Sequence, residues 1–283
     1  MSSSPILPLE LEMAIFELCA LSLPIFIPKL MLVAHRVKEW VEPILCRTIC
    51  ICPDDSAPEF PHFTQDTVVP FIAHKTTGFL RKHVRHFAHI DEMPVEENGK
   101  CLLAICSDVE NLWIGYTNYT WICLVENLPL KRLDVELHLF LRLVEPTRPV
   151  FSRLTHLTLD EPAAASALAR LPMLSHLALS WRHAKAAEYG QVLELKTLVV
   201  FIIFQSSSST VAAEEEILWL TEDLRFVIMP LRNFICDWHS GIRKGEDYWS
   251  DAEAFVAMRQ TQGANALSCV WEPADSEPKS DAA

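Results

Sequence analysis

Histidine is the first residue type in this chain whose spacing invites a chemical interpretation. His83, His86 and His89 lie three residues apart, and three imidazoles can bind zinc. Val84 and Phe87, however, have the spacing of buried positions around a strand. Because side chains alternate along a strand, His86 would point away from the face shared by His83 and His89. We therefore expect no metal ion at this cluster.

Cysteine offers a second candidate ligand set, because Cys46, Cys50 and Cys52 form a C-x3-C-x-C pattern. A structural zinc site needs a matching second half with C-x2-C or H-x3-H spacing, and none follows in the sequence. Ile49 and Ile51 alternate with Cys50 and Cys52, which is typical of small apolar residues in a core. The sequence thus predicts neither a metal nor a cofactor.

The chain also lacks the short motifs that mark common enzyme sites. No GxGxxG, GxxxxGK[ST], GxSxG or HExxH occurs, and only seven residues are glycine. Loops that cradle phosphates need glycine so that the backbone can approach the anion. Asp237 and His239 flank Trp238, but no spacing or nucleophile turn selects a catalytic triad. We expect no catalytic residue, and a binding protein rather than an enzyme.

Composition narrows the classes of partner. The 283 residues are 50% apolar, enough for the core of one large domain or two small ones, and the net charge is -13. That charge argues against nucleic acid and against an anionic membrane surface. The stretch 18–28 near the start is apolar, but it holds two prolines and falls short of the ~20 residues that span a bilayer. Nine cysteines and no secretory signal favour reduced thiols in a cytoplasmic or nuclear protein.

The first 52 residues have a helical pattern that differs from the rest. Leu11, Ala14, Ile15 and Leu18 recur at i, i+3, i+4 and i+7, which predicts an amphipathic helix. Prolines interrupt the pattern at 23–28, and two further apolar runs follow, so we expect three short helices. The apolar residues are too many for so small a bundle to cover. We therefore expect a partner or a neighbouring domain to cover one face.

The order of these residues resembles a known module, the F-box. The matching pieces are Leu7-Pro8, Glu10-Leu11, Ile15-Phe16 and the block from Leu32-Val33 through His35-Arg36-Val37 to Trp40. The whole chain is similar to F-box-like proteins that are abundant in mushroom-forming fungi, with a degenerate match over residues 5–50. The resemblance implies binding of a Skp1-type adaptor of cullin ubiquitin ligases through Leu7, Pro8, Leu11, Ile15 and Phe16. The alternative is a helical cap on the following domain.

A repeat begins after a linker at 53–61, which holds three prolines and three acids. The pattern L-x-x-L-x-L, with apolar substitutes, has its middle position at Leu112, Leu133, Leu157, Leu177 and Leu198, spaced by 21, 24, 20 and 21 residues. Weaker units lie at 84–87 and 224–227. Such units stack their strands into a curved parallel sheet. We expect an α/β fold: the F-box-like helical segment over 1–52, then an irregular leucine-rich-repeat-like solenoid over 62–244. An irregular α/β domain is the alternative.

The residues between the buried positions should line the concave surface of such a sheet, where repeat proteins commonly bind. The candidate target-binding residues are Trp113, Arg132, Asp134, His156 and His176. Thr158 is expected to be exposed on the same surface, as are Thr197, Val199 and Phe201 in the fifth unit. The surface is either a recognition patch for a protein target or an ordinary solvated sheet face, and the residues alone do not identify a target.

The end of the chain predicts one more helix and a tail. Residues 245–271 form a C-terminal unit whose helix covers 245–260, with Ser250 as the N-cap and Glu253 completing a capping box. Residues 272–283 are polar and contain proline, so we expect them to be disordered.

Overall fold

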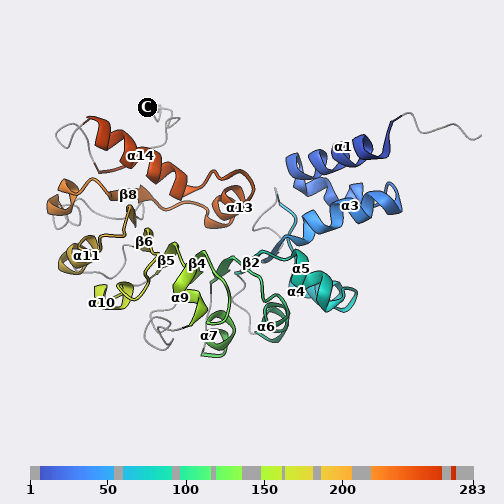
Figure 1. Ribbon diagram of the computed structural model, residues 1–283, viewed down its shortest axis with the longest axis horizontal. Helices are drawn as coiled ribbons and strands as arrows, with labels where there is room; N and C mark the ends of the chain where they lie inside the picture. The colour runs from blue at the N-terminus through green and yellow to red at the C-terminus, as the bar shows by residue number, and fades with distance from the viewer. Residues whose placement is uncertain are drawn as a thin grey trace, which may run out of the picture.

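The computed structural model in Figure 1 describes residues 7–53, 60–90, 96–115, 119–135, 148–160, 163–180, 186–205, 218–262 and 269–271. Eight strands form one sheet in which neighbours follow the order of the chain, and every neighbouring pair is parallel. The strands are β1 (Thr48–Ile51), β2 (His86–His89), β3 (Asn111–Ile114), β4 (Arg132–Val135), β5 (His156–Leu159), β6 (His176–Ser180), β7 (Val200–Gln205) and β8 (Phe226–Pro230). The prediction of an α/β fold with parallel strands is confirmed.

Helices lie on both sides of the arc that the strands form (Figure 1). Among the described residues, the helices between strands are α4 (Gln65–Ala73), α5 (Thr77–His83), α6 (Glu96–Ile105), α7 (Tyr119–Val125), α9 (Pro149–Arg153), α10 (Ala165–Leu168), α11 (Ala186–Leu193) and the 3-10 turn η2 (Leu218–Glu222). Helices α6, α7, α9, α10 and α11 follow the outer side of the arc. Two helices after the last strand, α13 (Phe234–Lys244) and α14 (Tyr248–Gln262), lie on the inner side.

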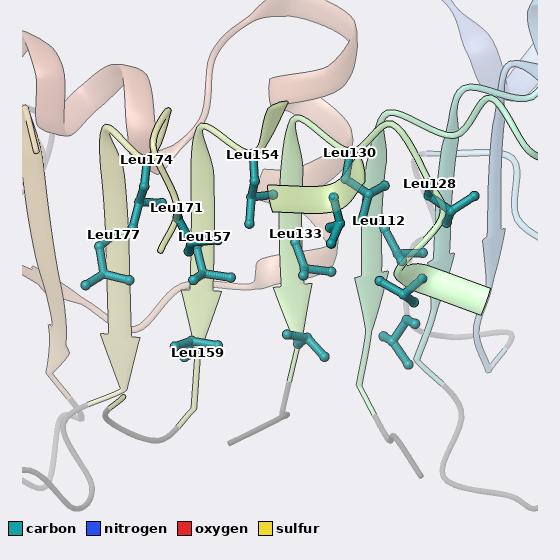
Figure 2. Packing of buried hydrophobic residues seen from close by; sticks show 14 of the residues in the cluster. Leu112, Leu128, Leu130, Leu133, Leu154, Leu157, Leu159, Leu171, Leu174 and Leu177 are labelled. Carbon is teal, nitrogen blue, oxygen red and sulfur yellow. The ribbon is translucent and has the colours of Figure 1, made fainter. Parts of the chain in front are cut away.

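The main core lies between the sheet and the outer helices. Leu112, Leu133, Leu157 and Leu177 occupy equivalent positions on β3 to β6, each paired with the next by register, and all are buried. Figure 2 shows these leucines side by side across neighbouring strands. Burying one leucine fully stabilises the fold by ~1.5–3 kcal/mol, so burial of the leucines of the L-x-L pattern stabilises the alignment of the strands.

The fifth repeat unit has a different register from the predicted one. Leu198 is buried, but it lies before β7, and the partner of Leu177 is Phe201. Phe201 packs in the main core, while Val199 is exposed. Two overlapping patterns compete here, and the structure uses Leu198, Phe201 and Ile203 because an aromatic ring fills the middle position as well as leucine does. The prediction that Phe201 lies on the concave surface is therefore wrong.

A small bundle precedes the sheet. It consists of α1 (Leu9–Ser22), the 3-10 turn η1 (Pro24–Phe26), α2 (Ile27–Leu30) and α3 (His35–Cys46), packed around Ala20, Ile27, Val37 and Val41. The first strand, β1, begins at Thr48, inside the segment predicted to be wholly helical. Ile49 and Ile51 belong to the main core and pair with β2, so the sheet begins before the expected boundary at residue 52. Of the predicted linker at 53–61, residues 54–59 lie outside the described residues.

Single residues extend the sheet beyond both terminal strands. Phe63 forms a parallel bridge with Ile51 of β1, and Val270 forms one with Ile228 of β8. Each bridge has two backbone hydrogen bonds; Phe63 N, for example, donates to Cys50 O at 2.8 Å. The predicted disordered tail at 272–283 lies outside the described residues.

Candidate functional site

The outward face of the N-terminal bundle is apolar. Leu11, Ile15 and Leu18, the predicted helical stripe of α1, have 53%, 48% and 65% of their surface exposed. Leu32 and Val33, in the turn before α3, are exposed by 85% and 62%. We call the exposed side chains of Leu7, Leu11, Ile15, Leu18, Leu32 and Val33 the α1 surface. Globular proteins usually bury the apolar side chains of their helices, so α1 presents to solvent residues that such a protein normally hides.

The bundle itself determines this orientation. The side of α1 that packs on α3 carries Ala20, which is buried, and Phe16, whose ring centroid lies 6.4 Å from that of Trp40. Glu12 lies on the same side and accepts two hydrogen bonds from the guanidinium of Arg36, the shorter one 2.7 Å. Phe16 therefore belongs to the interior of the bundle, unlike the other four predicted adaptor-binding residues.

Leu7 and Pro8 lie at the start of α1, and both are exposed. The carbonyl of Pro8 accepts from the amides of Leu11 and Glu12, at 3.1 and 3.0 Å, which begins the helix at Leu9. Within the described residues no single helix has the length and composition to cross a membrane. Helix α1 and the segment Pro24–Leu30 pass that test only when taken together, and they are bent by 117°.

The inner face of the sheet is not an open surface. Helices α13 and α14 cover it, as Figure 1 shows. Trp113 of β3 packs against Phe234 and Trp238 of α13, and His176 of β6 packs against Trp249 of α14. Trp113 and His176 are 9% and 6% exposed. The expectation of an uncovered concave surface is wrong, because two helices of the same chain occupy it.

Arg132 anchors the start of α14. Its guanidinium donates to Asp247 Oδ2 at 2.6 Å, and about a third of the Arg132 side chain remains exposed. Asp247 also accepts from Ser250 N, while Asp247 N donates to Ser250 Oγ. This reciprocal pair is a capping box with Asp247 as the N-cap, so the predicted N-cap, Ser250, is wrong by three residues. Gly241 of α13 makes room for this carboxylate, since a Cβ there would lie 2.2 Å from Asp247 Oδ2.

Asp134 lies deeper on the same face. Burial raises the pKa of its carboxyl to about 8, helped by the charge of Asp160 and opposed by a hydrogen bond with Thr158. Thr158 Oγ1 lies 2.8 Å from the hydroxyl of Tyr248, and Thr158 is 6% exposed, so its predicted exposure is wrong. Arg132, Asp134, Thr158 and Tyr248 line a small pocket with room for about one water molecule. Its size suits a bound solvent molecule rather than a substrate.

His156 and His176 are brought together by the register of β5 and β6. They are direct partners, and their rings stack with centroids 4.1 Å apart and planes 8° apart. His176 Nε2 lies 2.7 Å from a carboxylate oxygen of Glu253 on α14. Burial lowers the pKa of His156 to about 2 and also lowers that of His176, although Glu253 opposes the latter shift. Both residues hold the same position in consecutive repeat units, so the spacing of the sequence pattern already implies that they are neighbours.

Within the described residues, neither the His83, His86 and His89 set nor the Cys46, Cys50 and Cys52 set brings three ligand atoms together. His83 ends α5, whereas His86 and His89 lie on β2 with opposite orientations, His86 bonded to Asn111 at 2.9 Å and His89 beside Trp121. Cys46 ends α3, and eight cysteines of the described part of the chain are free thiols.

Comparison of the chain with protein-family models, with curated proteins and with solved structures gives no match. Two features of the structure therefore bear on function: the α1 surface and the covered inner face.

Proposed function

We propose that the chain is a protein-binding adaptor, not an enzyme, and that its N-terminal bundle is F-box-like and docks on a Skp1-type adaptor of a cullin ubiquitin ligase. We further infer that the eight-stranded body is an irregular leucine-rich-repeat-like solenoid that holds a target protein, in the cytoplasm or nucleus. The observation that carries the proposal is the outward orientation of the apolar stripe of α1.

The side chains of the α1 surface are all apolar, and they lie on neighbouring elements. Leu11, Ile15 and Leu18 repeat along α1, and α1 packs on the turn and helix that follow it. Leaving them in water forgoes ~25 cal/mol for every Å² of apolar area, so a folded chain keeps such a face when a partner covers it. A helical cap on the next domain would turn the same stripe inward, and this observation therefore favours docking over the alternative scaffold with no ubiquitin role.

The covered inner face limits how a target protein can bind. Trp113 and His176 can reach a target only if α13 and α14 leave the sheet. Arg132 keeps part of its side chain exposed and His156 is half-buried, so a target that binds the assembled protein contacts the rim beside the start of α14. Of the five predicted target-binding residues, Arg132 and His156 are therefore the ones that we expect a target to contact.

The test is binding of the purified full chain to a purified Skp1-type adaptor. Changing Ile15 and Leu18 together to Ala removes two exposed anchors. Buried interface anchors often contribute ~2 kcal/mol or more each, so the dissociation constant should rise at least ~30-fold at ~1.4 kcal/mol per decade. Binding by the unaltered chain should persist at high salt, because apolar contacts are not screened.

A matched control removes two apolar side chains of similar exposure from the body: Met173→Ala with Val199→Ala, at 53% and 49% exposed. This variant should bind the adaptor as the unaltered chain does. Phe16→Ala is unsuitable as a probe, because Phe16 supports the bundle. Failure of the unaltered chain to bind micromolar adaptor would contradict the proposal, and so would capture by neutral lipid vesicles in place of the adaptor.

A further inference from the structure

We propose that His156, His176 and Glu253 form a binding site for a divalent transition-metal ion, best matched by zinc, which ties α14 to the sheet. One ligand atom from each residue lies within 4.8 Å of the other two. The two histidines come from neighbouring strands and the glutamate from the helix that covers them, so the three ligands belong to two structural layers.

The outer contacts of both imidazoles favour metal binding. His156 Nδ1 lies 2.8 Å from Thr155 Oγ1, and His176 Nδ1 lies 2.8 Å from Ser175 Oγ. A metal-binding histidine usually uses one ring nitrogen for the ion and holds the other in a hydrogen bond that fixes the ring. Here the same hydroxyl partner recurs in two consecutive repeat units, and it leaves Nε2 of each ring for the ion.

The charges around the cluster are compatible with a cation. Arg132 is the nearby positive group, but Asp247 holds its guanidinium at 2.6 Å and offsets its charge. Glu253 supplies a carboxylate that is 53% exposed, so one side of the site opens to water.

The donor set points to zinc. Two imidazole nitrogens and one carboxylate oxygen are borderline ligands that zinc accepts at ~2.0–2.2 Å, and three protein ligands leave a fourth position for water. Calcium and magnesium prefer sites built from oxygen alone. Tetrahedral binding needs the two nitrogens about 3.4 Å apart with their lone pairs converging, so the stacked rings must rotate toward Glu253. Trp249, which meets both rings edge to face at 5.2 and 5.6 Å, limits how far they turn.

The experiment titrates the chelator-treated full chain with Co²⁺, a visible spectroscopic probe for zinc sites, and then displaces it with Zn²⁺. We expect one Co²⁺ per chain, the visible absorption of a low-coordinate nitrogen and oxygen site, and a melting temperature that rises with Zn²⁺. His156→Gln should weaken Co²⁺ binding at least ~100-fold, and Glu253→Gln at least ~10-fold. Thr155→Ala and Ser175→Ala should each weaken it ~10-fold, as loss of an orienting hydrogen bond does.

The matched control is His74→Gln with His83→Gln. His74 directly follows α4, and His83 is the last residue of α5. This double variant should bind Co²⁺ within ~2-fold of the unaltered chain. If His156→Gln fails to fold, Glu253→Gln decides, because its side chain is half exposed. The proposal is overturned if the unaltered chain takes up no Co²⁺ tighter than ~10 μM, or if neither site variant changes its uptake.

Discussion

Helices α1 and α14 have similar lengths, but the more apolar helix, α1, buries fewer of its residues. Helix α1 has 14 residues, most of them apolar, and buries only Ala20. Helix α14 has 15 residues of mixed polar and apolar composition and buries five, namely Tyr248, Trp249, Ala252, Val256 and Arg259. Apolar content alone therefore does not decide which helix packs on the body. Helix α14 is attached by buried apolar side chains together with directional contacts, whereas α1 leaves most of its apolar side chains exposed.

Arg259 is the clearest of these directional contacts. It is 2% exposed, and its guanidinium donates to four backbone carbonyls, including those of Phe226 and Thr221 at 2.7 Å. A planar fork of donors can satisfy several carbonyls at once, which a hydrophobic side chain cannot do. The far end of α14 is thereby bound to the turn before β8.

The largest expected effect contrasts one apolar residue from each helix. Trp249→Ala removes a buried indole that packs on His156 and His176, and it should lower the free energy of unfolding by ~3–5 kcal/mol. Leu18→Ala in α1 should change it by less than ~0.5 kcal/mol, since the side chain is 65% exposed. Urea unfolding of both variants checks the contrast. Equal losses would show that the two helices are packed alike.

A smaller effect is expected from two glycines that differ only in their surroundings. Gly241→Ala puts a methyl group onto Asp247, which must leave Arg132 and the cap of α14, at ~1–3 kcal/mol. Gly78→Ala, in α5, meets nothing within 4 Å and should stabilise the chain by ~0.5–1 kcal/mol through reduced backbone entropy of the unfolded chain. Thermal melting of both variants should show shifts of opposite sign.

The inner face should also give the stability of the chain a pH dependence. The pKa of Asp134 is raised to about 8 from 3.8, so between these values the folded chain binds the extra proton and stability falls as pH rises. His86 and His156 act oppositely. Their pKa values are lowered to about 3 and about 2 from 6.5, so their stabilising contribution is present above pH 6.5 and is lost as pH falls below it.

Asp134→Asn should therefore flatten the fall in stability between about pH 4 and pH 8 and leave the acid-side loss in place. Urea midpoints at about pH 5, 6.5 and 8 measure this change. Asp66→Asn, at an exposed position of α4, is the control and should leave the slope above pH 5 unchanged. An unaltered slope in Asp134→Asn would place the responsible carboxyl elsewhere.

The smallest effect on folding concerns the α1 surface. Leu11→Ser with Leu18→Ser, at 53% and 65% exposed, should change stability by less than ~1 kcal/mol. The same change should lower self-association at high concentration, because it interrupts an exposed apolar patch. Sedimentation of the variant and the unaltered chain over a range of concentrations measures this. A large loss of stability would mean that α1 packs on the body.

Local patterns predicted the strands wherever leucine filled the repeat. Leu133, Leu157 and Leu177 are buried on successive parallel strands as expected. Phe201 and Phe226 fill the middle position of the last two units, so the leucine pattern predicted the wrong register for the fifth unit and only a weak unit at 224–227. Strand β1 was missed because its Ile49-x-Ile51 alternation is only four residues long and directly follows a helix.

The inner face could not be predicted from such patterns. The ion pair that anchors α14 joins Arg132 to Asp247, 115 residues apart, and no periodicity links them. The alternation of side chains along each strand predicted which residues point away from the main core. It did not predict which of those residues are covered by α13 and α14. The outward orientation of α1 was equally hidden. The apolar stripe of α1 predicts a helix. The side of α1 that packs on α3 instead carries Glu12, Phe16 and Ala20, which lie outside that stripe.

The single-residue bridges at the two ends of the sheet have a consequence for solubility. Eight parallel strands in chain order leave a first and a last strand whose backbone groups could accept a strand from another molecule, and head-to-tail addition of that kind does not close. Phe63 and Val270 occupy part of those positions. Prolines at 63 and 271 would each remove a bridging amide, because Phe63 N donates to Cys50 O and Trp271 N donates to Ile228 O, and we expect such a chain to form fibres on storage. The two bridges therefore hinder the addition of strands from other molecules to the ends of the sheet.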